Sequence, residues 1–314
     1  MAVVAVPKKQ IERRRWLTYS RRLALTGYLL VIPVALVLLA LVAYPFGYAI
    51  YISFTSRVVG DAGEWVGFDN FRYLRQWPSF TRAIQNTVVM VVVSDLLKLG
   101  IGLGLALLLN ERIRGRGLFR SVILLPWAIP GFVAFLAWKL LLMPIGGGVS
   151  LLLAETPFND AVTGWLGQQG IIDWLGQKST ALPAVIAATT WRGFPFWCIS
   201  FLAALQTVPS ELYEAAKIDG ANAWQRFWSV TVPHIRHVVL VVTLLSSIWT
   251  ANSFENIWIM TQGGPSDATM VFPVLAYFGM QSQRLGEAAA VSVALIPALL
   301  ILVFFVTWAL QRED

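Results

Sequence analysis

The sequence contains six long, continuous apolar stretches separated by polar segments. They lie at residues 28–54, 86–109, 118–143, 182–206, 237–260 and 286–310. Each is long enough to cross the roughly 30 Å hydrocarbon core of a bilayer as a helix of about 20 residues. Lipid offers no partner to backbone amides and carbonyls, so only helices and closed barrels span it. Because the stretches do not alternate as barrel strands do, the sequence predicts an all-α membrane protein with six transmembrane helices.

Composition agrees with this class and excludes several others. Of the 314 residues 57% are hydrophobic and 13% are charged, against about 25% charged in soluble domains. One cysteine excludes an intramolecular disulfide and a cysteine-based metal cluster, and two histidines are too few for a histidine-rich metal site. We therefore expect no metal site. The net charge of +7 is explained by membrane topology and anionic lipid headgroups, so we expect no nucleic-acid partner.

The distribution of Lys and Arg predicts the orientation. Fifteen of these residues lie in the N-terminal segment, in the loops after the second and fourth stretches and at the C-terminus, and six lie in the loops on the opposite side. Cytoplasmic loops are richer in Lys and Arg. We therefore expect a cytoplasmic basic segment at 1–27, a transmembrane domain at 28–310 and a cytoplasmic tail at 311–314. The long basic start and the length of the first apolar stretch argue against a cleavable signal peptide.

The polar segment between the fourth and fifth stretches, residues 207–235, is predicted to form two short helices in the cytoplasm. Asp219-Gly220 ends the first helix, with glycine supplying a left-handed residue. Asn222 and Gln225 have the spacing of a capping box for the second helix, and Pro233 is expected to end it. Three interpretations are open for such a segment: an amphipathic loop on the membrane surface, a DNA-binding helix-turn-helix, or a docking element for a soluble partner. The DNA interpretation is weak, because the second helix is poor in cations and tethered at both ends to membrane spans.

This segment carries a resemblance to a known family. The stretch "EAAKIDGANAWQRFWSVTVP" resembles the EAA motif of ABC importer permeases, which has the form EAA-x3-G-x9-I-x-LP. Valines replace the Ile and the Leu, and the matching residues are Glu214, Ala215, Ala216, Gly220 and Pro233. The stretches "WVGFDNFRYL", "LPWAIPGFVAFLAWK", "TTWRGFPFW" and "TQGGPSDAT" are similar to binding-protein-dependent carbohydrate-uptake permeases with a maltose-type "F" subunit. The chain lacks the large periplasmic insertion of the enteric maltose protein.

The resemblance implies a type I ABC importer permease fold in a bacterial inner membrane. It implies three partners: a second homologous permease, a homodimeric cytosolic ABC ATPase, and an extracytoplasmic solute-binding (lipo)protein. The chain has no Walker A pattern, GxxxxGK[ST], so ATP and Mg belong to the partner ATPase. We expect a non-catalytic translocation subunit that binds no cofactor. The ATPase-docking residues implied by the motif and its turn are Glu214, Ala215, Ala216, Asp219, Gly220 and Pro233.

Polar residues and helix breakers within the stretches predict the solute path. Pro126 and Pro130 interrupt the third stretch, and "RGFPF" and "WTANSFENIW" place polar and aromatic residues in the fourth and fifth. Non-helical backbone is tolerated at membrane depth where protein or a water-filled cavity satisfies it. Asn252 and Asn256 are four residues apart, so one helix face should present both. The predicted path residues are Arg192, Gly193, Phe196, Trp249, Asn252, Glu255 and Asn256.

We expect the solute to be a neutral di- or oligosaccharide, because amides and aromatics in the predicted path outnumber cations. The alternative is glycerol 3-phosphate or another polar solute, which Arg192 would favour. Two other classes are weaker: a membrane enzyme, for which no acid–base or metal motif is present, and an ion-driven transporter, against which the EAA segment argues. Asp95 and Lys98, three residues apart, are expected to neutralise each other. Arg192 and Glu255 either pair across two helices or line the path.

Overall fold

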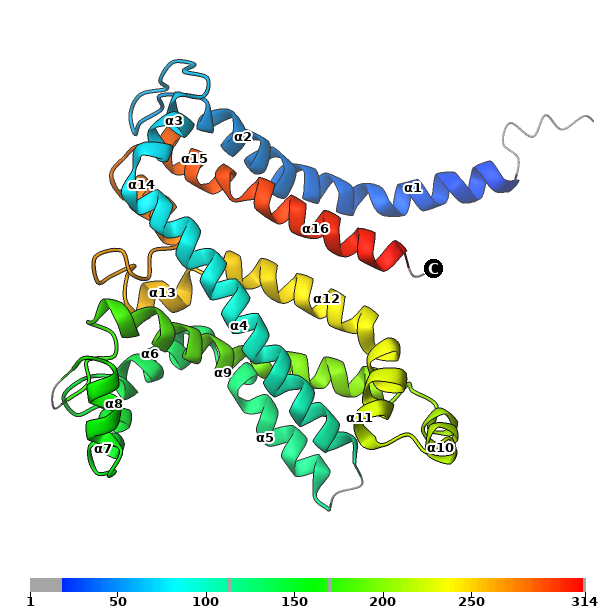
Figure 1. Ribbon diagram of the computed structural model, residues 1–314. Coiled ribbons are helices and arrows are strands. Elements are labelled where there is room, and N and C mark those ends of the chain that lie inside the picture. Colours follow the sequence, from blue (N-terminus) through cyan, green and yellow to red (C-terminus); the bar gives the residue numbers. More distant parts are fainter. Residues whose placement is uncertain (1–18, 112–113, 169–170, 313–314) are drawn as a thin grey trace, which may run out of the picture. The chain divides into compact units, whose positions relative to one another are not determined.

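The computed structural model describes residues 19–111, 114–168 and 171–312, and it divides the chain into two compact units, Met1–Tyr51 and Ile52–Asp314 (Figure 1). The regular elements in these ranges are helices, with two isolated β-bridges, Thr55–Trp65 and Val58–Asp61. Most of the predicted basic segment 1–27 lies outside the described residues, as do Arg112 and residues 313–314 of the predicted tail.

The described residues of the first unit form one long apolar helix. It comprises α1 (Tyr19–Leu38), a π-helical turn (Leu39–Ala43) and most of α2 (Tyr44–Ser53), whose last two residues belong to the second unit. The segment Leu23–Ser53 has 31 residues and a mean hydropathy of 2.7, which is long and apolar enough to cross a membrane. It corresponds to the first predicted span, 28–54.

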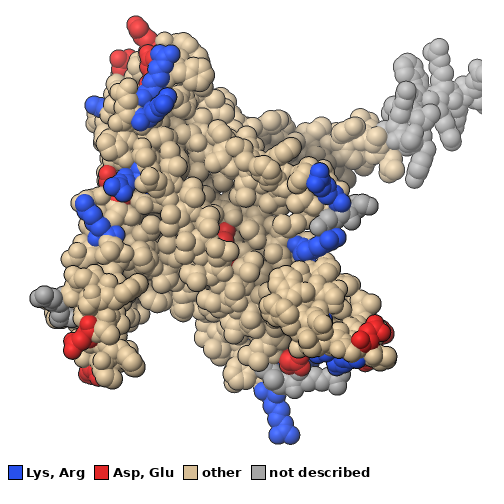
Figure 2. All heavy atoms as spheres, viewed as in Figure 1, with Lys and Arg blue, Asp and Glu red and all other residues tan. Residues whose placement is uncertain are grey.

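The second unit contains the remaining helices. In chain order these are α3 (Asp69–Gln76), α4 (Pro78–Asn110), α5 (Arg116–Ala128), α6 (Gly131–Leu141), α7 (Gly148–Ala154), α8 (Asn159–Trp165), α9 (Lys178–Leu205), α10 (Ser210–Ile218), α11 (Ala223–Arg226), α12 (Val232–Ala251), α13 (Glu255–Met260), α14 (Phe272–Gln281), α15 (Leu285–Ala294) and α16 (Ile296–Gln311). Three segments are apolar and long enough to span: Pro78–Asn110, Ala223–Ala251 and Leu285–Gln311. On the face shown in Figure 2, charged side chains lie mostly toward the margins of the view, and the central surface is largely uncharged.

The predicted third span, 118–143, is not a straight helix. Helices α5 and α6 pass the same test only as a pair and are bent by 89° at the short break between them. Pro130 forces the break, because the residue before a proline is pushed out of the helical region: Ile129 is extended, with φ −70° and ψ 132°. The predicted interruption is confirmed, and the expectation of one continuous span is corrected to a bent pair.

Helix α9 corresponds to the fourth predicted span, yet it is not among the apolar candidates although it has 28 residues. Half of its residues are buried, and it packs most extensively against α4. Gly102 of α4 allows this approach, since a Cβ there would lie 2.7 Å from the Cβ of Trp197. The least apolar long helix is therefore the one that the protein itself covers, and side chains rather than lipid surround its polar centre.

The fifth predicted span differs from the structure at both ends. Helix α12 stops at Ala251 and α13 begins at Glu255, so 237–260 is not continuous. At the other end Pro233 does not terminate a helix: a π-helical turn, Phe227–Thr231, joins α11 directly to α12. Proline lacks an N–H and its ring clashes with the carbonyl four residues earlier. A widened π turn just before the proline relieves both problems, and the π turn of the first unit likewise precedes Pro45.

Candidate functional site

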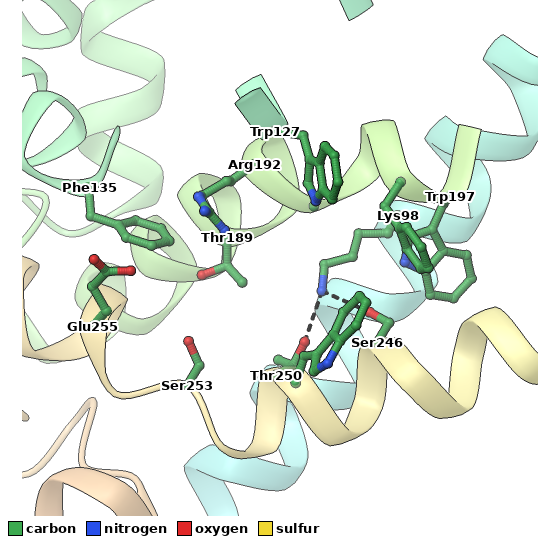
Figure 3. A pocket seen from close by; sticks show the side chains of 13 residues that line it. Lys98, Trp127, Phe135, Thr189, Arg192, Trp197, Ser246, Thr250, Ser253 and Glu255 are labelled. Carbon is green, nitrogen blue, oxygen red and sulfur yellow. Dashed lines mark hydrogen bonds between the residues drawn. The ribbon is translucent and has the colours of Figure 1, made fainter. Parts of the chain in front are cut away.

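A cavity of about 150 Å³ lies among α4, α9 and α12, beside the break between α5 and α6 and the break between α12 and α13 (Figure 3). The first break was expected from Pro126 and Pro130; the second was not, but it falls in the polar stretch that the sequence assigned to the solute path. The structure thus brings the interruptions of two helices together around one polar space, the arrangement in which non-helical backbone is tolerated at membrane depth.

Five of the seven predicted path residues line this cavity. They come from α9, α12 and the start of α13: Arg192, Gly193, Phe196, Trp249 and Glu255. The rings of Phe196 and Trp249 contact each other, with their centroids 5.1 Å apart and their planes tilted by 59°. The structure therefore gathers these residues from segments separated by some fifty positions in the chain, and it gives the cavity both an aromatic wall and charged groups.

The two predicted asparagines do not line the cavity. Asn252 is exposed, and its side-chain amide donates to the carbonyl of Ile248 at 2.8 Å. Asn256 is fully buried; its amide donates to Thr189 Oγ1 at 2.9 Å, and Ser253 Oγ donates to its Oδ1 at 2.7 Å. The expectation that one helix face presents both asparagines is wrong, because the helix breaks between them. Asn256 is instead hydrogen-bonded to Thr189 and Ser253, two hydroxyl residues that do line the cavity.

Sequence reasoning did not select the other lining residues individually, although Thr250 and Ser253 lie in the stretch "WTANSFENIW" that was assigned to the path. These other lining residues are Lys98, Trp127, Phe135, Thr189, Trp197, Ser246, Thr250 and Ser253. The hydroxyls among them add hydrogen-bonding groups to the aromatic wall. Their signal in the sequence was weak, since single Ser and Thr residues in an apolar helix also bond to their own backbone.

Lys98 belongs to a buried ionic network that joins α4 to α12. Its ammonium donates to Asp95 Oδ1 (3.2 Å), Ser246 Oγ (3.2 Å) and Thr250 Oγ1 (3.0 Å). The carboxylate of Asp95 also accepts from Ser246 Oγ at 2.6 Å and from Ser247 Oγ at 2.7 Å. The expected neutralisation of Asp95 and Lys98 is confirmed. Each charge is both paired and hydrogen-bonded, as buried ions require.

Arg192 and Glu255 approach each other at Gly131, the first residue of α6, without forming an ion pair in the described structure. A Cβ at Gly131 would collide with the Glu255 carboxylate and lie 3.3 Å from Arg192 Nη2. The guanidinium carbon of Arg192 lies 5.8 Å from the centroid of the Phe135 ring, a cation–π distance. Both charged groups therefore line the cavity at the α5–α6 break, the second of the two alternatives expected for them.

The predicted docking segment forms two short helices, α10 and α11, with the expected turn between them. Asp219 ends α10 and Gly220 has φ +80°, a left-handed conformation that favours glycine. Asn222 Oδ1 accepts from the Gln225 amide at 2.9 Å, and Gln225 Oε1 accepts from the Asn222 amide at 2.8 Å. The predicted capping box is confirmed.

The side chains of this segment are largely exposed. Glu214, Ala215, Asp219, Gly220 and Pro233 are exposed, and Ala216 is half-buried. Ile218 and Trp224 are 87% and 68% exposed. Large exposed apolar side chains are typical of a contact surface for another protein or for a membrane.

Comparison with known proteins decides the family. The family described as "Binding-protein-dependent transport system inner membrane component" matches residues 98–312, more than half of the chain. The chain belongs to this family. It is therefore an inner-membrane transport component, and the resemblance seen in the sequence is confirmed.

Several relatives of this transport component cover nearly the whole chain. The trehalose/maltose transport system permease protein MalF of Thermococcus litoralis is 32% identical over 86% of this chain and 89% of its own length. The diacetylchitobiose uptake system permease protein DasB of Streptomyces coelicolor is 31% identical over 94% and 90%. A solved bacterial ABC transporter involved in the import of the acidic polysaccharide alginate matches with a TM-score of 0.76 at 24% identity, over 93% of this chain and 96% of that one. This likeness shows a shared fold.

Proposed function

We propose that this chain is one of two permease subunits of an ATP-driven importer and that its solute is a neutral di- or oligosaccharide. The observation that carries the proposal is the cavity, whose lining combines hydroxyl groups, aromatic faces and balanced charges in a member of a transport family. The names of its relatives, which include trehalose/maltose and diacetylchitobiose permeases, support a carbohydrate.

The chemistry of the lining suits a sugar. A sugar entering the membrane gives up hydrogen bonds to water, and leaving them unmade costs about 1–3 kcal/mol for each buried group. The hydroxyls of Thr189, Thr250 and Ser253 line the cavity and can replace them. The rings of Phe196 and Trp249 offer apolar faces for the C–H side of a pyranose.

The charges of the cavity favour a neutral solute over glycerol 3-phosphate. Lys98 is compensated by Asp95 at 3.2 Å, and Arg192 shares its corner with Glu255. No cation of the described lining is left in excess for a phosphate. The fold alone does not decide the point, since a solved transporter of this fold serves an acidic polysaccharide.

The size of the cavity implies that transport requires movement. About 150 Å³ is less than the roughly 300–1,000 Å³ of ordinary ligand pockets. A disaccharide therefore needs the helices around the cavity to separate. Alternating between closed and open arrangements by rigid-body motion is a known means of such gating.

The proposed topology has six crossings and cytoplasmic termini. The crossings are Leu23–Ser53, α4, the bent pair α5–α6, α9, α12 and the joined α15–α16. In this arrangement α10 and α11 lie in the cytoplasm, where Glu214, Ala215, Ala216, Asp219, Gly220 and Pro233 dock onto a homodimeric ATPase. That ATPase binds ATP and Mg, and this chain catalyses no reaction. A homologous second permease completes the pathway, and an extracytoplasmic binding protein delivers the solute.

Reconstitution tests the proposal. The chain is placed in proteoliposomes with its proposed partners, which are the second permease, the ATPase and the binding protein. Uptake of labelled trehalose, maltose, diacetylchitobiose and glycerol 3-phosphate is then measured with and without ATP. We expect ATP-dependent uptake of at least one neutral sugar and none of glycerol 3-phosphate. An ATPase that binds but cannot hydrolyse ATP is the control. Uptake of glycerol 3-phosphate alone would contradict the neutral-sugar proposal.

A further inference from the structure

Glu255 is the single acidic side chain among the described residues that line the cavity. It lies against Gly131 at the start of α6: a Cβ at Gly131 would be 3.0 Å from Glu255 Cδ and 3.3 Å from Arg192 Nη2. In this arrangement the two charged groups occupy the space that a side chain at position 131 would fill. Figure 3 shows Glu255 and Phe135 side by side, with Arg192 reaching toward the same corner.

Positive charge is concentrated at this corner. Within the described structure Arg192 forms no hydrogen bond or ion pair, and its Nε is buried without a partner. Helix α6 begins at Gly131 without a side-chain cap, so its first amide groups and the positive end of its dipole lie at the same corner. Without an anion, a guanidinium and a helix N-terminus at one corner of the cavity would attract negative solutes.

The other cation of the cavity does not change this balance. Lys98 is paired with Asp95, and its ammonium is further bonded to two hydroxyl oxygens. Asp95 is not among the cavity-lining residues, and its carboxylate compensates the charge of Lys98. The net charge that a solute meets in the cavity therefore depends on Glu255: it is close to zero with the carboxylate and one unit positive without it.

We propose that Glu255 is the charge-selectivity residue of the cavity. Its carboxylate cancels the positive corner formed by Arg192 and the start of α6, which lets uncharged solutes pass and excludes anionic ones. This inference rests on the proposed function, because it takes the cavity to be the solute path. It predicts that a single isosteric change, Glu255→Gln, converts the cavity from neutral to anion-attracting without altering its shape.

The potential in the cavity can be measured without knowing the solute. Ser253 lines the cavity two residues from Glu255, and Ser253→Cys places a thiol there by a small change. The one native cysteine, Cys198, is fully buried and is not expected to react. The assembled transporter in lipid nanodiscs, which expose both membrane faces, is treated with an anionic reagent, 2-sulfonatoethyl methanethiosulfonate, and with a cationic one, its trimethylammonium counterpart. The ratio of the two rates reports the local potential.

We expect Glu255→Gln to raise the anionic-to-cationic rate ratio at least about tenfold. Arg192→Gln should lower the ratio by a similar factor, and the double variant should return it close to the parent value. Glu155→Gln, the same change at an exposed glutamate in the loop after α7, is the matched control and should leave the ratio unchanged.

An unchanged ratio in Glu255→Gln, or a double variant that fails to restore the parent ratio, would overturn the inference. A second measurement connects the potential with selectivity: uptake of a disaccharide and of its uronic-acid counterpart by the reconstituted transporter. If the ratio shifts as expected but no sugar is taken up, the charge balance stands and the proposed function fails. If sugar is taken up but the ratio does not shift, the proposed function stands and the charge-selectivity role of Glu255 fails.

Discussion

Removing the Asp95 carboxylate should destabilise the protein more than any other single change in its ionic network. In Asp95→Ala the ammonium of Lys98 stays in a site where 4% of its side chain is exposed. It keeps two hydroxyl oxygens as partners but loses its counter-charge, while Ser246 and Ser247 lose their acceptor. Breaking a buried ion pair from one side costs about 3–5 kcal/mol.

The opposite change should cost less. In Lys98→Met the Asp95 carboxylate still accepts from Ser246 at 2.6 Å and from Ser247 at 2.7 Å, so the anion stays hydrogen-bonded. The buried carboxylate still loses its counter-charge, so we expect a loss of about 3 kcal/mol, at the lower end of the range for a buried pair broken from one side. The double change Asp95→Leu/Lys98→Met removes both charges, and the freed hydroxyls can turn to carbonyls of the preceding turn. It should lie within about 1 kcal/mol of the parent, as other buried pairs replaced by apolar residues do.

The assay is the apparent melting temperature of the purified transporter, read from the fraction that remains monodisperse after heating. At roughly 2–4 °C for each kcal/mol, Asp95→Ala should melt about 6–20 °C below the parent, Lys98→Met at an intermediate temperature, and the double variant near the parent. Equal melting of Asp95→Ala and the parent would refute the reasoning. So would a double variant whose loss equals the sum of the two single losses, because independent sites add and coupled ones do not.

Three further predictions concern docking, topology and the solute path. Glu214→Lys should leave the membrane helices folded and weaken co-purification of the ATPase, since charge reversal at a paired site costs several kcal/mol; recovery of a stoichiometric, fully active ATPase would contradict the docking proposal. A cysteine at Ser266 should react with an impermeant maleimide in intact cells and one at Ser229 only after permeabilisation, and the reverse pattern would overturn the orientation. Phe196→Ala, which removes a ring of the cavity wall, should slow uptake about tenfold, whereas Asn252→Leu, outside the cavity, should leave it near the parent rate; equal uptake in both variants would place the solute elsewhere.

The helical architecture was largely predictable because apolar length is a local property. Four of the six predicted spans have a helix that is long and apolar enough, and the third is a bent pair at the proline that the sequence singled out. The exceptions have physical causes. Pro233 was expected to end a helix, since proline removes a donor, but the π turn before it absorbs that loss. Helix α9 is polar for a span, and only its burial among other helices explains this.

The site was predictable to the extent that polar and aromatic residues at membrane depth are unusual. Arg192, Phe196 and Glu255 were found in this way and line the cavity. Lys98 was recognised as an ion but not as a cavity residue, because its bond to Ser246 joins positions 148 apart in the chain. The rotation of one helix against another decides such contacts, and no local pattern specifies it. No local pattern specified the three-residue break between α12 and α13 either, and this break separates Asn252 from the helix face that it was expected to share with Asn256.

The path from the docking segment to the cavity runs along a single element. Helix α12 continues from Val232 to Ala251, about 30 Å at 1.5 Å per residue, and Gly and Pro are absent from its interior, so it has few of the usual causes of a kink. At one end the π turn ties it to α11, and at the other it carries Ser246 and Thr250 into the cavity. If an ATPase docks on α10 and α11 as proposed, a shift that it imposes on them would reach this wall as a tilt of a rigid helix. Helix α12 ends immediately beyond these residues, and the next helix, α13, packs against α6. The wall that holds Glu255 therefore need not move together with α12. Under the docking proposal, the cavity lies between a wall that the ATPase would move and one that it would leave in place, and such a difference would widen the cavity for a sugar.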